Sequence, residues 1–144
     1  MSNSLLNISF LTFILASFAY AANNLSSREN LKKIFGHAGS GILFLGLVLI
    51  TAAILFRWQE AQRPPFSNMY ESLILFSWAI VLVYLVLELI YKIRIVGTIA
   101  AILAVTAIAA ASFFNSNIDP LVPALKSNWL TYHVFTCFIG YAAF

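Results

Sequence analysis

The sequence predicts an all-α polytopic membrane protein with four complete transmembrane helices and the start of a fifth, and with its N-terminus outside. Of its 144 residues, 62% are hydrophobic and only 9% are charged, whereas soluble domains carry about 25% charged residues. The apolar residues also gather into long runs separated by short polar connections. Because about 20 apolar residues cross a bilayer as a helix, this length leaves no room for a sizeable soluble core. We therefore interpret residues 1–144 as a single transmembrane domain.

The first span is predicted over residues 5–22 and ends at Asn23 and Asn24. Ala19-Tyr20-Ala21 resembles the small-x-small site at which signal peptides are cleaved. However, residues 1–4 carry no positive charge, and a signal peptide needs a basic start. We therefore expect this segment to remain as a membrane span.

The second span is predicted over residues 36–56, between a lysine pair and the interfacial pair Arg57-Trp58. Small residues near its start favour close helix packing, and they are Gly36, Gly39 and Gly41. The third and fourth spans are predicted over residues 68–91 and 95–114. The three residues between them, Lys92-Ile93-Arg94, make a connection short enough to force an antiparallel hairpin.

A fifth apolar run covers residues 129–144, where the sequence stops. Its 16 residues make about 24 Å of helix, against a hydrocarbon core of about 30 Å. A terminal carboxylate at Phe144 would lie in or near the apolar layer, at a cost of several kcal/mol. We therefore expect the chain to be the N-terminal portion of a longer protein.

Orientation is predicted from the basic residues of alternate connections. One side carries five of them and the other side three, with none before the first span. The larger group, expected inside, is Arg28, Lys32, Lys33, Lys92 and Arg94; the smaller group is Arg57, Arg63 and Lys126. This scattered distribution excludes a nucleic-acid-binding face, which needs clustered cations. The one cysteine, Cys137, excludes an internal disulfide and a thiolate metal cluster.

The connection after the second span combines a rigid turn with a helix start. Pro64 and Pro65 fix the backbone. Asn68 followed three residues later by Glu71 fits a capping box, in which the Asn side chain caps the helix and Glu71 reaches back to the N–H of Asn68. A role of Glu71 in ligand or partner contact is the alternative.

The second outer connection leads to Trp129 and, one helical turn later, His133. Residues four apart share a helix face, so His133 lies below an interfacial tryptophan near the outer membrane boundary. A neutral imidazole there is a candidate axial ligand for a metal or haem iron. A lone histidine at a helix end is more often an interfacial residue, and spacing alone leaves both interpretations open. Cys137, a further turn along, shares this face and is expected to be a packing thiol.

Two other polar residues are interpreted as structural. His37 lies among the glycines at the start of the second span. Glu88 lies inside the third span, four residues before Lys92, and acids inside a membrane are functional candidates by default. We expect Glu88 and Lys92 to form an ion pair that reaches the membrane surface.

Taken together, the two outer connections resemble the CcsA/ResC-type (system II) cytochrome c biogenesis proteins of bacteria and plastids. The resemblance lies in two long motifs in the same order, over more than half of the chain. They are RWQE (57–60), PFSNMYESL (65–73) and FSW (76–78), then LVPALKSNWL (121–130), His133-Val134 and Tyr141-Ala142. The residues before Arg57 match only in being hydrophobic.

The resemblance implies haem handling, by export to or retention at the outer face of a plasma or thylakoid membrane, and covalent attachment of b-type haem to the CxxCH thiols of apocytochrome c. It also implies a CcsB/ResB-type membrane partner. His133 maps to an outer axial ligand of the haem iron, and Trp129 would cover the porphyrin edge. The family's tryptophan-rich segment and its other histidines would follow Phe144, so we do not expect residues 1–144 to catalyse attachment alone.

Two interpretations from other classes stay open. One is a transporter or channel fragment without haem, although such folds usually show inverted repeats and broken helices. The other is a structural assembly subunit that docks a partner through Glu71, Pro64 and Pro65. Co-purified haem would favour the cytochrome c biogenesis interpretation over both of these.

Overall fold

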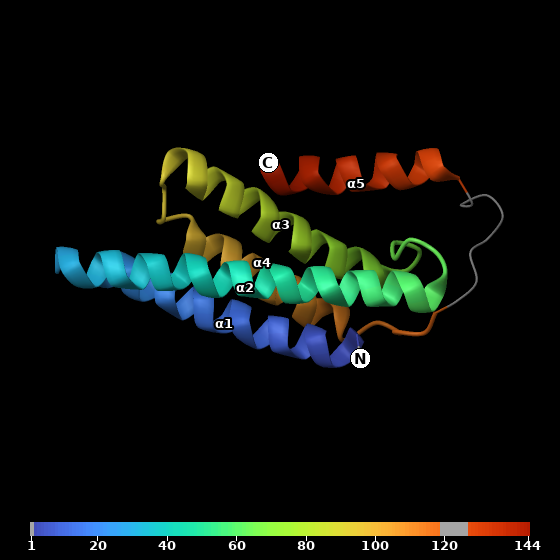
Figure 1. The fold of residues 1–144 in the computed structure, drawn as a ribbon, viewed down its shortest axis with the longest axis horizontal. Coiled ribbons are helices and arrows are strands. Elements are labelled where there is room, and N and C mark those ends of the chain that lie inside the picture. Colours follow the sequence, from blue (N-terminus) through green and yellow to red (C-terminus); the bar gives the residue numbers. More distant parts are fainter. Residues whose placement is uncertain (1, 119–126) are drawn as a thin grey trace.

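The computed structural model describes residues 2–118 and 127–144, and this part of the chain consists of helices and their connections without a strand. The helices are α1 (Ser2–Leu25), α2 (Glu29–Ala61), α3 (Met69–Tyr91), α4 (Gly97–Ala111) and α5 (Asn128–Ala143) (Figure 1). The all-helical prediction is confirmed. Lys126 and residues 121–126 of the second motif lie outside the described residues.

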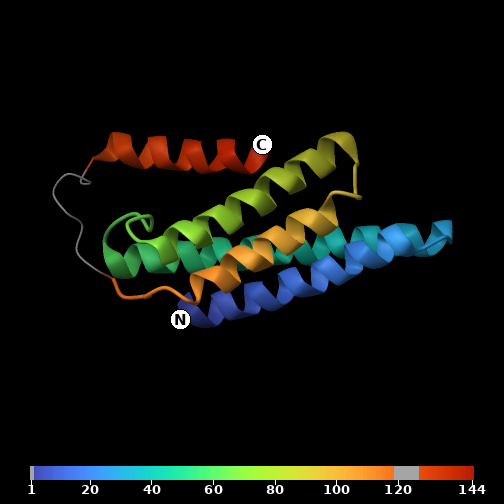
Figure 2. The same ribbon diagram turned by 180° about the vertical axis from the view of Figure 1, so that it is seen from behind.

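Helices α1 to α4 run alternately up and down, and α5 lies along α3 on the side away from α1 (Figures 1 and 2). Helix α1 packs against α2 and α4, whereas α3 packs against α4, α2 and α5. Hydrogen bonds near the middle of α3 tie it to its neighbours: Ser77 Oγ donates to the Ala104 carbonyl at 3.0 Å, and Trp78 Nε1 donates to Thr51 Oγ1 at 2.9 Å. Because α3 contacts the other helices on several sides, it is the central helix of the bundle.

Three helices are long and apolar enough to cross a membrane: Asn3–Leu25, Glu29–Ala61 and Met69–Tyr91. In the most apolar stretch of each, only 33% to 44% of the residues are buried within the protein. Most of their apolar surface is therefore directed outward, as expected for helices surrounded by lipid. These helices mark the chain as a membrane protein.

The fourth predicted span is shorter than expected. Helix α4 has 15 residues, or about 22 Å, because residues 95–96 and 112–114 form turns instead of extending it. Four complete spans and an outside N-terminus therefore stay predictions. Helix α2 is longer than the predicted 36–56, since the polar residues at both of its ends continue the helix.

Glycines allow α1 and α2 to approach closely. A Cβ atom added to Gly46 would overlap the Phe13 ring, and one added to Gly39 would lie 3.2 Å from the Tyr20 ring. Gly36 lies equally close to the side chains of other elements, but a Cβ on Gly41 would meet nothing within 4 Å. The predicted close packing is therefore confirmed for Gly36 and Gly39 and wrong for Gly41.

Candidate functional site

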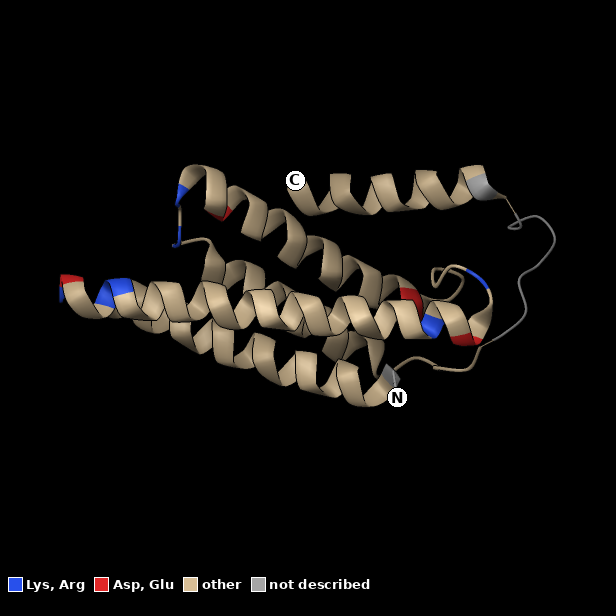
Figure 3. Ribbon diagram, in the orientation of Figure 1, with Lys and Arg blue, Asp and Glu red and all other residues tan. Residues whose placement is uncertain are grey.

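Charged residues gather towards the two opposite ends of the bundle and leave its middle without charge (Figure 3). One end holds what we call the Glu71 cluster, whose side chains are Arg57, Arg63, Ser67, Asn68 and Glu71. The other, which we call the basic end, holds Arg28, Lys32, Lys33, Lys92 and Arg94. Helix α5 starts at the Glu71 end. Since α5 carries Trp129 and His133, the candidate site lies at this end.

Asn68 caps α3, as predicted. Its backbone is extended (φ −131°, ψ 167°), and its Oδ1 accepts a hydrogen bond from the Glu71 N–H at 2.8 Å. The reciprocal half of the predicted capping box is wrong. The Glu71 carboxylate accepts instead from the backbone N–H and the hydroxyl of Ser67, at 3.0 and 3.1 Å.

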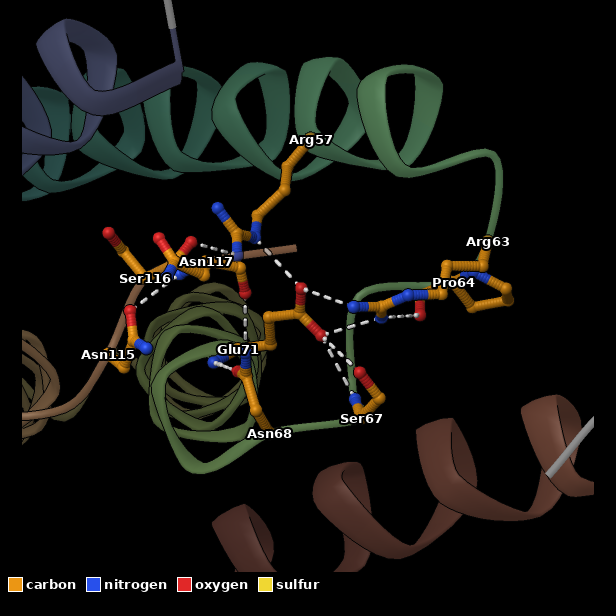
Figure 4. Close-up of polar contacts among 9 residues, drawn as sticks. All are labelled: Arg57, Arg63, Pro64, Ser67, Asn68, Glu71, Asn115, Ser116 and Asn117. Carbon is orange, nitrogen blue, oxygen red and sulfur yellow. Dashed lines mark hydrogen bonds and ion pairs between the residues drawn. The ribbon is translucent and has the colours of Figure 1, made fainter. Parts of the chain in front are cut away.

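The carboxylate is drawn away from the cap because two arginines bind it (Figure 4). Arg57 Nε donates to Oε1 at 2.9 Å, and Arg63 Nη1 donates to Oε2 at 2.9 Å. Glu71 is only 1% exposed, and both arginines are buried as well. Removing one member of such a buried charge group leaves the others without compensation and costs about 3–5 kcal/mol. Glu71 therefore holds the end of α2, the connection after it and the start of α3 together.

The cluster also holds the segment that leads from α4 towards α5. Arg57 Nη2 donates to the Ser116 carbonyl at 2.8 Å, and Asn68 Nδ2 donates to the Asn117 carbonyl at 3.2 Å. The Arg57 guanidinium also lies over the Tyr70 ring, with 4.9 Å between its central carbon and the ring centroid. The same side chains that fix the α2–α3 connection therefore also fix the first residues after α4.

The sequence did not reveal the role of Arg57 and Arg63, which it used only as an interfacial residue and in the count of basic residues for orientation. Pro64 and Pro65 lie beside them in the rigid connection, where Pro65 is buried and Pro64 half-buried. The predicted contacts of this connection with a partner stay a prediction.

Helix α5 packs through aromatic side chains on one of its faces. Phe135 stacks on Trp58 at 6.4 Å between ring centroids and meets Trp78 edge-on at the same distance. Phe138 contacts Phe76 at 6.2 Å. These contacts set the rotation of α5 about its own axis, and therefore decide which of its residues face outward.

Trp129 and His133 lie on the outward face of α5. Trp129 is 84% exposed and His133 is also exposed. His133 Nε2 lies 3.5 Å from Cys137 Sγ, so the predicted common face of these three residues is confirmed. A hollow of about 200 Å³ adjoins the imidazole, lined by His133, Val134, Cys137, Phe138 and Tyr141.

This outward face can offer a metal one imidazole beside apolar and aromatic surface. The described residues contain no group of three or more His, Cys, Asp or Glu side chains arranged to hold a metal ion. Among the described residues, this face therefore offers a metal a single imidazole donor.

At the basic end, the predicted ion pair between Glu88 and Lys92 is wrong. Glu88 Oε1 is bound by Arg94 Nε at 3.2 Å, and Glu88 Oε2 accepts from the Tyr20 hydroxyl at 2.6 Å. The helix ends at Lys92 in a left-handed conformation (φ 56°), which breaks the spacing of four residues on which the prediction relied. His37 is exposed, with Nδ1 2.8 Å from the Lys33 carbonyl, and this position fits its structural interpretation.

The matches to curated relatives cover almost the whole chain. Residues 66–144 match the family described as "Cytochrome C assembly protein". The chain is 35% identical to a "Cytochrome c biogenesis protein CcsA" of Mesostigma viride over 143 residues, which are 96% of this chain and 46% of that protein. It is 39% identical to the CcsA of a Picosynechococcus strain, over 95% of this chain and 41% of the relative. For the CcsA of a Synechocystis strain the identity is 36%, over 94% and 41%.

The chain thus spans less than half the length of these curated relatives, and it matches their N-terminal part. No solved structure matches it.

Proposed function

Since the chain belongs to the cytochrome c assembly protein family, we propose that it acts in cytochrome c biogenesis and binds haem at the Glu71 end, with His133 as an axial ligand of the iron. The observation that carries this proposal is the exposed imidazole of His133 on the outward face of α5, within the residues matched by the family. Haem is the substrate in this proposal, and the protein contributes its binding and orientation.

The residues around His133 support the proposal through their chemistry. Imidazole is a common metal ligand. Trp129 lies one turn before it, and Tyr141 lies on the same outward face at the far side of the hollow. Both rings are largely exposed, so they are available to cover the edge of a porphyrin.

The Glu71 cluster would act as the support of this site. It anchors Ser116 and Asn117, and the aromatic contacts of Phe135 and Phe138 orient α5. A ligand held by supporting contacts keeps the orientation that binding needs.

The second axial ligand and the machinery for attachment would come from outside residues 1–144. We propose that the chain works with a CcsB/ResB-type subunit in a bacterial plasma or thylakoid membrane. The outer, periplasmic or lumenal face would be the one at which haem is joined to the CxxCH thiols of apocytochrome c. The connection that carries Pro64 and Pro65 is the surface we propose for contact with that subunit.

The test is spectroscopic and uses the chain purified with its CcsB/ResB-type subunit. We expect a haem Soret band that His133→Ala weakens and that added imidazole restores, because imidazole can occupy the vacated iron position. His37→Ala is the matched control, since His37 lies at the other end of the bundle and should leave the band intact. An unchanged band in His133→Ala would remove His133 from the site. Absence of haem from the assembly would favour a transporter fragment or a structural subunit instead.

A further inference from the structure

The basic end of the bundle contains a hollow that the proposed haem site does not use. Its volume is about 440 Å³, and the ends of α1, the first turns of α2 and the α3–α4 connection form its walls. A neighbouring hollow of about 570 Å³ shares Lys33, Lys92 and Arg94 with it. Cations thus converge on one concave region from the start of α2 and from the α3–α4 connection, which are far apart in the sequence.

The positive charge of this hollow is only partly compensated within the protein. Arg94 is paired with Glu88, but no ion pair joins the ammonium groups of Lys32, Lys33 and Lys92 to another described residue. Glu29 is the one carboxylate in the lining. Three ammonium groups without an ion pair against one carboxylate leave a net positive charge of about two, which suits an anionic ligand.

The walls of the hollow are held together by amide side chains. Asn23 Nδ2 donates to the Lys32 carbonyl at 2.5 Å. Asn24 Nδ2 donates to Thr98 Oγ1 at 3.1 Å and to the Ile95 carbonyl at 3.3 Å. These bonds join α1 to α2 and to the start of α4, so the cations do not depend on a ligand for their arrangement.

The position and the apolar part of the lining favour a lipid as the source of the anion. The hollow lies where the long apolar helices end, which is the level of the lipid headgroups. Ile93 and Ile95 also line it and are 50% and 67% exposed. A soluble anion would use only the cations, whereas a lipid would use the cations for its phosphate and the isoleucines for its acyl chains.

We propose that this hollow binds the phosphodiester headgroup of an anionic membrane lipid. Lys32, Lys33 and Lys92 bind the phosphate oxygens, and Ile93 and Ile95 contact the upper part of an acyl chain. The site ties the α3–α4 hairpin to the start of α2 through the lipid.

Native mass spectrometry of the purified full chain in detergent tests this proposal. Phosphatidylglycerol and phosphatidylcholine are added separately, and we expect one phosphatidylglycerol to be retained at concentrations about tenfold lower than phosphatidylcholine. Lys33→Gln combined with Lys92→Gly should abolish that preference. Glycine is the favoured residue at the left-handed position of Lys92, so this variant removes an ammonium group without harming the helix end, and an unchanged melting temperature would verify this.

Arg28→Gln is the matched control, because Arg28 is an exposed cation at the same end that does not line the hollow. It should keep the preference for phosphatidylglycerol. Equal retention of the two lipids, or an equal loss in the control and the double variant, would overturn the proposal in favour of diffuse surface charge. Competition by glycerol phosphate at the same concentration as the lipid would overturn the assignment to a lipid and indicate a soluble phosphate ligand.

Discussion

Replacing Glu71 with glutamine would remove the buried carboxylate that both Arg57 and Arg63 bind. Glutamine has nearly the same shape but offers one acceptor oxygen where the carboxylate has two, and its amide group would face donors. In the native protein, Oε2 alone accepts from Arg63 Nη1 and from the N–H and hydroxyl of Ser67. Breaking a buried charge group in this way costs about 3–5 kcal/mol, so we expect Glu71→Gln to lower the free energy of unfolding by that amount.

Unfolding can be followed by circular dichroism during SDS titration of the purified chain in mixed micelles. Glu60→Gln is the control, because Glu60 is exposed near the same end and forms no ion pair with a described residue. The free energy of unfolding of this surface variant should stay within about 0.5 kcal/mol of that of the native protein. Trypsin cleavage after Arg57 should also accelerate in Glu71→Gln alone, since Arg57 is buried in the native protein.

A double-mutant cycle separates the ion pair from the loss of shape. Arg57→Met combined with Glu71→Gln should cost clearly less than the sum of the single changes, because the two side chains interact at 2.9 Å. If Glu71→Gln lowered the free energy of unfolding by less than about 1 kcal/mol, the reasoning would be refuted, since removing the anion of a buried ion pair costs more than that. Strict additivity in the cycle would likewise refute a direct interaction.

The remaining predictions concern local stability and use the same titration. Asn68→Ala removes the α3 cap and should cost about 1–2 kcal/mol, whereas Ser127→Ala should be neutral because Ser127 caps α5 without a side-chain hydrogen bond; equal effects would contradict the assignment of the cap. Gly46→Ala should destabilise because its Cβ would overlap the buried Phe13 ring, while Gly41→Ala should stabilise by about 0.5–1 kcal/mol through helix propensity. A Gly46→Ala change that does not destabilise would show that α1 and α2 do not need the close approach.

Local periodicity explains which predictions about the site were confirmed. Trp129, His133 and Cys137 share one face of α5 because they are four residues apart in a helix, and no tertiary contact is needed for that. The cap of α3 by Asn68 is local in the same sense, since it joins residues three apart. Such features follow from backbone geometry once a helix is correctly predicted.

The rule that residues four apart share a helix face failed where α3 ends. Glu88 and Lys92 are four residues apart, but the left-handed turn at Lys92 ends the helix and brings Arg94 to the carboxylate instead. For Glu71, the pattern predicted the cap but could not predict the competing arginines, which lie 14 and 8 residues earlier. Pairing over such separations depends on how the connection folds, and spacing alone does not specify it.

By itself, the sequence determined that this chain is helical and membrane-embedded, because its few charges are confined to short connections and a bilayer imposes helices on apolar runs of this length. It also determined the common face of Trp129 and His133. Only the tertiary structure decided that Glu71 joins the α2–α3 connection to the segment after α4, and that aromatic packing directs His133 outward. The physical reason is that helices obey the bilayer and their own periodicity, whereas ion pairs and ring contacts form between whichever side chains the packing brings within reach.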